Sequence, residues 1–183
     1  MENNIKIPTE EECYSIIKKH NMLANIIEHS KQVMRVSVAL VDNLIDSTIV
    51  NRELIIAAAL LHDIAKTETL KSGELRHDRM GAKIMADLGY NEIAEIVDSH
   101  VIFESFSPGG KLEEREIIHY ADKRVMHNRI VTIDERINDI QERYGKYIKD
   151  KEILIQRKLL IKEIEKKIQG FLFSDITSIL AGI

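Results

Sequence analysis

Residues 52–66 read RELIIAAALLHDIAK. The run from Leu54 to Leu61 is apolar on all sides, which predicts a buried central helix. Asn51 precedes it and can act as its N-cap. The helix therefore carries His62 and Asp63 into the interior, where polar side chains need partners. This helix is expected to form the centre of the fold, and the two polar residues at its end raise the question of what they bind.

The rest of the chain predicts an all-α fold. It has two prolines and eight glycines, and apolar residues recur mainly at three- and four-residue spacing. Two capping boxes, Thr9 with Glu12 and Thr132 with Glu135, mark helix starts. Gly89 is expected to end one helix and Asn91 to cap the next. The expected helices cover about 9–21, 22–45, 52–63, 77–88, 91–100, 112–129, 132–144 and 148–169, with loops at 66–76 and 105–111.

Size and composition predict one soluble domain. The 183 residues suit a single domain, and 26 Lys and Arg against 30 Asp and Glu give a net charge of −4. This balance argues against nucleic acid as a partner. Cys13 is the single cysteine, so an internal disulfide and cysteine-based zinc motifs are excluded. Without a signal peptide or membrane span in the sequence, we expect a cytoplasmic protein.

Six histidines and aspartates lie at helix ends or inner faces and are candidate metal ligands: His29, His62, Asp63, His77, His100 and Asp122. Imidazole with carboxylate suits Fe, Mn, Ni, Co or Zn, and Mg is less expected. Neighbouring residues project about 100° apart on a helix, so one carboxylate could bridge two ions. A water activated by such ions could attack a phosphate ester. Taken singly, each residue could instead be a hydrogen-bonded core histidine or a capping aspartate.

The order of these residues resembles a known superfamily. His29 in EHSKQV, HD at 62–63 after an apolar helix, and Asp122 in YADK look like the H…HD…D pattern of the HD-domain metal-dependent phosphohydrolases. The resemblance covers about residues 20–130. It implies a helical bundle. Beyond the resemblance, we expect additional C-terminal helices at about 131–183, which either pack on the core or form the surface of a homodimer.

The resemblance also implies how the ligands divide between ions. His29, His62, Asp63 and Asp122 would hold one ion. HDRMG at 77–81 and His100 in IVDSH resemble the second-ion positions of two-metal members, with Asp63 as the bridge. The nearest branches are HDIG-type hydrolases and, more distantly, symmetrical diadenosine tetraphosphatases, which share HD-x-A-K and ADK.

Three basic residues are candidates for substrate phosphate. Lys66 matches a family lysine that neutralises phosphate, although it could instead pair with Asp63 along the helix. Lys123 follows Asp122, and Arg129 would lie two helical turns beyond Asp122, unless both are solvated surface residues. The remaining histidines match no family position; among them only His119, one turn before Asp122, is a candidate to support a ligand.

These observations predict a metal-dependent phosphohydrolase. It would cleave a phosphate ester or phosphoanhydride bond, and a nucleotide is the expected substrate. The reaction would use one or two divalent transition-metal ions, with Asp63 and Lys66 as catalytic residues. The alternative is a non-catalytic HD module that binds a nucleotide or a protein partner. The substrate would be a small phosphate-containing molecule.

Overall fold

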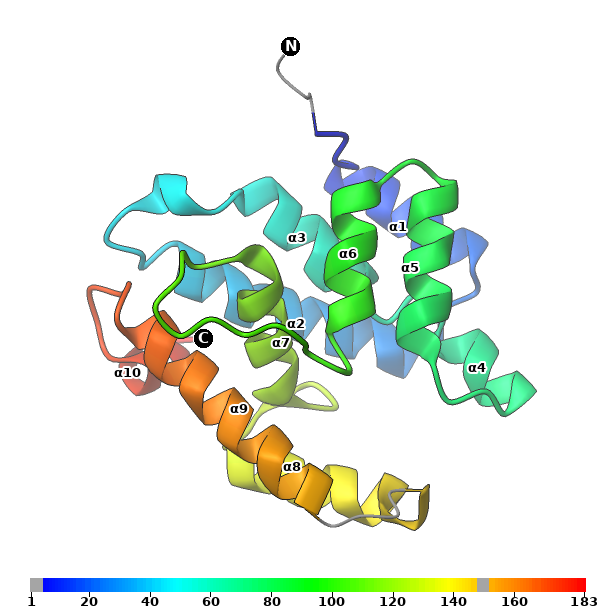
Figure 1. Ribbon diagram of the computed structural model, residues 1–183. Helices are drawn as coiled ribbons and strands as arrows, with labels where there is room; N and C mark the ends of the chain where they lie inside the picture. Colours follow the sequence, from blue (N-terminus) through cyan, green and yellow to red (C-terminus); the bar gives the residue numbers. More distant parts are fainter. Residues whose placement is uncertain (1–4, 148–151) are drawn as a thin grey trace.

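The computed structural model describes residues 5–147 and 152–183 and confirms the all-α prediction (Figure 1). Its strand content is one two-stranded hairpin, β1 (Val125–Met126) with β2 (Arg129–Ile130). None of the helices in these ranges is long and apolar enough to cross a bilayer. The α-helices are α1 (Glu10–Lys19), α2 (Ala24–Val41), α3 (Arg52–Leu61), α4 (Lys66–Ser72), α5 (His77–Asp87), α6 (Asn91–Ser99), α7 (Glu114–Lys123), α8 (Ile133–Tyr144), α9 (Glu152–Gln169) and α10 (Ile176–Ala181).

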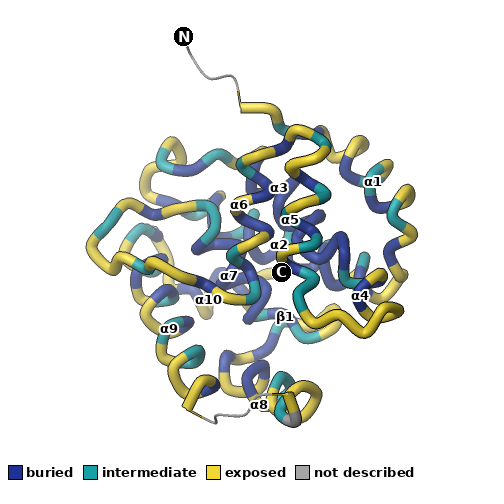
Figure 2. The backbone as a smooth tube through the Cα atoms, turned by 45° about the vertical axis from the view of Figure 1, so that its right-hand side comes forward, coloured by how far each residue is buried: buried dark blue, intermediate teal, exposed yellow. Residues whose placement is uncertain are grey.

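Helix α3 is the buried centre of the bundle, as its sequence predicts. It packs against α1, α2, α6 and α7, and all its residues from Leu54 to Leu61 except Ile56 are buried (Figure 2). The three alanines at 57–59 are small, which allows the surrounding helices to approach closely. The side chain of Asn51 accepts from Glu53 N and Leu54 N and so caps the helix as expected. The rigid core thus ends directly at His62.

Helices α5 and α6 form an antiparallel pair against this core. Gly89 adopts φ 81, and the hydrogen bonds from Gly89 N to Ala86 O and from Tyr90 N to Met85 O close the end of α5. The predicted glycine terminator is therefore confirmed. Asn91 is not the cap of α6, because it is already the first helical residue and Tyr90 occupies the cap position. The pair brings His77, at the start of α5, beside His100, at the end of α6.

Two predicted segments differ in the structure. Part of the 66–76 loop is helix α4, because Thr67 and Thr69 are buried and Thr67 Oγ1 accepts a hydrogen bond from Leu23 N at 2.9 Å. The helix predicted over 112–129 is too long: α7 ends at Lys123, and the hairpin follows. His127 takes a left-handed φ of 58 at the hairpin turn, which breaks the helical path.

The C-terminal helices pack on this core. Helix α9 contacts α7 and α8, and α10 contacts α2 (Figure 1). The buried ammonium of Lys167 in α9 donates to Glu116 Oε1 at 2.7 Å and to the carbonyls of Ser107 and Lys111 at 2.9 and 2.8 Å. The predicted loop at 105–111 is therefore held against α9. Both predicted capping boxes, Thr9 with Glu12 and Thr132 with Glu135, are present. The first four residues of the helix predicted over 148–169 lie outside the described residues.

Candidate metal centre

The first group of ligands comes from three parts of the chain. His29 lies in the middle of α2, His62 and Asp63 follow α3 directly, and Asp122 lies in the last turn of α7. His29 Nε2 is 3.0 Å from Asp122 Oδ1 and 3.9 Å from Asp63 Oδ2. His62 Nε2 is 3.5 Å from Asp63 Oδ2 and 3.8 Å from Asp122 Oδ1. All four side chains are buried, and His29, His62 and Asp63 offer ligand atoms within 4.8 Å of one another, with Asp122 beside His29 and His62.

The second group shares Asp63. His77 Nε2 lies 3.1 Å and His100 Nε2 lies 3.5 Å from Asp63 Oδ1, and the two imidazole nitrogens are 3.2 Å apart. The other oxygen of the same carboxylate, Oδ2, faces His29 and His62. Each oxygen of Asp63 therefore faces one pair of histidines. This is the arrangement that a carboxylate bridging two ions requires.

Two buried atoms in this cluster show that a cation fits it. Among the described residues, His62 Nε2 has no hydrogen-bond partner, and Asp63 Oδ1 forms no well-aligned hydrogen bond although His77 Nε2 lies 3.1 Å away; both atoms are shielded from solvent. Buried polar atoms without partners are rare and destabilising. Both atoms are metal-binding types, and each belongs to a separate group of potential ligand atoms, one with His29 and the other with His77 and His100. A divalent ion in each group would satisfy them.

Backbone carbonyls fix the orientation of the rings. His62 Nδ1 lies 2.8 Å from Ala59 O, His100 Nδ1 lies 2.6 Å from Val97 O, and His29 Nδ1 lies 3.0 Å from His127 O. A carbonyl only accepts, so Nδ1 carries the proton in each ring. In His62 this leaves the Nε2 lone pair facing the centre, whereas His29 Nε2 lies 3.0 Å from Asp122 Oδ1, an acceptor whose place an ion would take. Such carbonyl contacts are typical of metal-binding histidines.

Burial and charge keep the ligands in their metal-binding protonation states. Burial lowers the pKa of His62 to about 3 and also lowers the pKa of His77. Burial opposes ionisation of Asp63, but the positive charge of Lys66, together with polar contacts from His100 and His77, outweighs it and holds its pKa well below the usual range. The same balance, with Lys123 and His29 as the main opposing groups, holds for Asp122. The imidazoles of His62 and His77 are therefore neutral, and the carboxylates of Asp63 and Asp122 charged, at neutral pH.

The two predicted lysines lie in this cluster in different ways. Lys66 Nζ is 2.6 Å from Asp63 Oδ2, and its side chain is still 23 % exposed. Lys123 Nζ is 2.5 Å from Asp122 Oδ2 and donates to His100 O at 2.9 Å, with its side chain buried. Lys123 therefore connects a ligand of the first group with the backbone of a ligand of the second.

The position of Arg129 gives no support for its predicted contact with substrate phosphate. The residue lies in β2 and not two helical turns after Asp122, and it is exposed. It lines a hollow beside α10 that contains none of the six predicted ligands. His119 is buried with its ring 5.0 Å from that of Phe103. Burial holds its pKa well below the usual value.

Sequence reasoning missed Arg136 and the backbone of His127. Arg136, in α8, is 91 % shielded and places Nη2 3.7 Å from Asp122 Oδ1. The His127 ring is exposed, as expected of a surface histidine, but its carbonyl orients His29. A charged residue in a charged amphipathic helix gives no sequence signal for such a contact, because the contact depends on how α8 packs.

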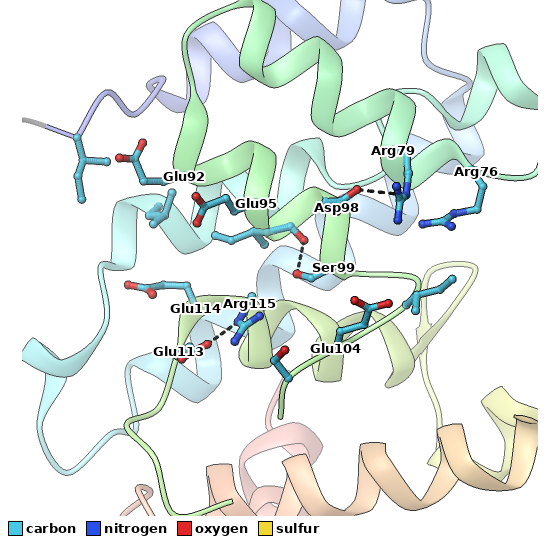
Figure 3. A pocket seen from close by; sticks show the side chains of 15 residues that line it. Arg76, Arg79, Glu92, Glu95, Asp98, Ser99, Glu104, Glu113, Glu114 and Arg115 are labelled. Atoms are coloured by element: carbon cyan, nitrogen blue, oxygen red, sulfur yellow. Dashed lines mark hydrogen bonds and ion pairs between the residues drawn. The ribbon is translucent and has the colours of Figure 1, made fainter. Parts of the chain in front are cut away.

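A second, larger hollow lies outside the metal centre. It has a volume of about 710 Å³ and is lined mainly by charged side chains from α5, α6 and the start of α7, including Arg76, Arg79, Glu95 and Arg115 (Figure 3). None of the six predicted ligands lines it. The candidate metal centre is thus defined by its buried side-chain atoms and not by this surface hollow.

Fold and site together define a helical domain with a His/Asp cluster that suits a divalent metal ion. The HD domain family matches residues 26–127, more than half of the chain, and the protein belongs to this family. It is also similar to a tRNA (cytidine(56)-2′-O)-methyltransferase of Picrophilus torridus, with 27 % identity over 150 residues. That match covers 75 % of this chain but only 42 % of the relative, so the chain spans less than half of its length. No solved structure matches.

Proposed function

We propose that the protein is a metal-dependent phosphohydrolase. The single observation that carries the proposal is the Asp63 carboxylate, whose two oxygens face two separate pairs of histidines. Two metal ions bound by these residues would stabilise both the attacking and the leaving oxygen of a phosphate ester. The HD family membership supports hydrolysis as the reaction class.

The protein residues have distinct roles in this proposal. His29, His62 and Asp122 would hold one ion, His77 and His100 would hold a second, and Asp63 would contribute to both. The bound ions supply Lewis-acid chemistry and an activated water. The rings deliver this chemistry to one point because backbone carbonyls fix Nε2 toward the centre. Fe, Mn, Ni, Co and Zn suit this donor set.

Lys66 and Lys123 have different roles. Lys66 lies beside Asp63 and is partly exposed, so its ammonium can turn to a phosphoryl oxygen as charge develops there. Lys123 is buried and already donates to Asp122 and to the His100 carbonyl. We therefore assign phosphate contact to Lys66 and positioning of the ligands to Lys123. The position of Arg129 does not support a contact with substrate.

The substrate class is a small phosphate-containing molecule, with nucleotides as the first candidates. Diadenosine tetraphosphate belongs in the test panel because of the sequence resemblance in HD-x-A-K and ADK. A tRNA belongs there as well, because one relative is named for a reaction on tRNA. A match to less than half of that relative gives no reason to assign methyl transfer to this chain.

The alternative is an HD module that binds a nucleotide or a protein without catalysis. The two functions differ in one cheap observation. A catalyst releases inorganic phosphate or a nucleotide product many times per chain, whereas a binding module gives at most one equivalent of bound ligand.

The test is a product-release screen with nucleotides, dinucleoside polyphosphates and tRNA, each in Mn, Fe, Co, Ni, Zn or Mg. We expect turnover with transition metals and loss of at least about 100-fold in Asp63→Asn, since that variant removes a charge from both ion sites. Asp87→Asn is the matched control, because Asp87 is exposed and pairs with Lys83. Equal activity in Asp63→Asn and the control would refute the proposal.

A further inference from the structure

Arg136 reaches the metal centre from outside the part of the chain that matches the HD family. The match ends at residue 127, and α8 begins at Ile133. Arg136 is nevertheless buried, and it faces Asp122, a ligand of the first ion. A buried guanidinium is expensive to desolvate unless its donors are used. What uses the donors of Arg136 is therefore a question about the site.

One edge of this guanidinium is not used within the described residues. Nη1 donates to Asp139 Oδ2 at 2.7 Å. Nη2 is 3.7 Å from Asp122 Oδ1, too far for a hydrogen bond, and Nε is buried without any partner. Nε and Nη2 form one side of the planar group and donate in parallel. This geometry matches two oxygens of one phosphoryl group.

A closed ring of contacts holds Arg136 in this position. Asp139 binds Arg136 and also accepts from Arg143 Nε at 2.7 Å. Arg143 Nη2 lies 3.0 Å from His127 Nε2, and the His127 carbonyl holds His29 Nδ1 at 3.0 Å. His29 in turn contacts Asp122, the residue that Arg136 faces. The guanidinium is thus positioned relative to the first-ion ligands before any substrate arrives.

The charges around the centre favour a multiply charged anion. Asp63, Asp122 and Asp139 supply three negative charges, and Lys66, Lys123, Arg136 and Arg143 supply four positive ones. Any bound divalent ion adds to this excess. The ammonium groups of both lysines already contact the carboxylates, so the free guanidinium edge is the available fixed donor pair.

We infer that Arg136 is a phosphate-binding residue: its Nε and Nη2 donate two parallel hydrogen bonds to oxygens of the substrate phosphoryl group. The inference rests on the proposed function and extends it, since it assigns the substrate's phosphate to the side of the centre covered by α8. The competing explanation is that Arg136 only positions Asp122 and so affects metal binding alone.

The test measures binding without turnover. The Mn-loaded full chain is titrated with inorganic phosphate by calorimetry, and Mn per chain is measured on the same samples. We expect Arg136→Ala to weaken phosphate binding about 10- to 100-fold and Arg136→Lys to weaken it less, because a lysine keeps the charge but not the fork. Mn per chain should stay at the wild-type value. Arg35→Ala is the control, because Arg35 is exposed on α2.

A second variant covers the case in which Arg136→Ala does not fold. Asp139→Asn keeps the guanidinium but loosens its hold, and we expect a smaller loss of phosphate affinity. The inference is overturned if wild type does not bind phosphate, if the variants bind it as wild type does, or if they lose only Mn. A chain that binds phosphate through Arg136 but hydrolyses nothing would refute the proposed function and leave the inference standing.

Discussion

Replacing Lys167 by Met should destabilise the whole domain strongly. The side chains of Lys167 and Glu116 are 3 % and 2 % exposed, so this ion pair is buried. The ammonium group makes three hydrogen bonds, to Glu116 and to the carbonyls of Ser107 and Lys111. Methionine has a similar length and retains most of the packing. The substitution therefore isolates the loss of the charge and its bonds.

The magnitude follows from what is left behind. Lys167→Met leaves the Glu116 carboxylate buried without its cation, and removing one partner of a buried pair costs about 3–5 kcal/mol. A domain with a total stability of about 5–15 kcal/mol would lose a large part of it. For a chain of this size the corresponding fall in Tm is roughly 6–20 °C. Adding Glu116→Gln removes the stranded charge, so the double variant should be more stable than Lys167→Met alone.

Urea denaturation followed by circular dichroism measures both effects. We expect one cooperative transition for the wild type and both variants, since Lys167 connects α9 to the loop before α7 in a single unit. The reasoning fails if Lys167→Met costs less than about 1 kcal/mol, or if the double variant is less stable than the single one. A separate early transition of α9 would refute the prediction of a single domain.

Three further predictions concern packing, the thiol and acid. Gly81→Ala should lower the free energy of unfolding, measured in urea, by up to about 2 kcal/mol. The added Cβ would lie 2.9 Å from Val97 Cγ1 and 3.3 Å from Ile64 Cγ2, and this over-packing should outweigh the gain in helix propensity of about 1 kcal/mol. A variant more stable than the wild type would contradict the prediction. Burial raises the pKa of the Cys13 thiol to about 12. At pH 8 a thiol reagent should therefore react more than about 100-fold more slowly with the folded chain than with the chain unfolded in urea. Equal rates in the two states would count against the prediction. Metal-free protein should lose stability as the pH falls from 6.5 toward 3, because burial lowers the pKa of His62 to about 3 and in this range only the unfolded chain binds the proton. The slope should approach roughly 1.4 kcal/mol per pH unit. In urea denaturation, His62→Gln should flatten the dependence of the unfolding midpoint on pH, and an unchanged slope would disprove the prediction.

The sequence predicts those elements whose signals are local. The apolar run 54–61, the Asn51 cap, the Thr9 and Thr132 capping boxes and the Gly89 terminator each act through neighbouring residues, and each is confirmed. The order of His29, His62, Asp63 and Asp122 indicates the family, whose match is confirmed over 26–127. The structure brings these four residues and the pair His77 and His100 together.

The features that were missed depend on tertiary packing. Helix α4 is polar in sequence, and its burial through Thr67 needs the backbone of Leu23, 44 residues away. The hairpin after α7 contains neither glycine nor proline and turns at His127 instead. Arg136 looks like one charge among many in α8, and its contact with Asp122 exists only because α8 packs beside α7.

Counting the metal ions per chain tests the central claim, that Asp63 joins two ion sites, most directly. The chain is stripped, dialysed against Mn and measured by elemental analysis, with Asp87→Asn as the exposed-carboxylate control. We predict two ions per chain in the wild type and the control, one in His77→Gln, and loss of tight binding at both sites in Asp63→Asn. A single ion in the wild type, or two ions retained by Asp63→Asn, would contradict the account.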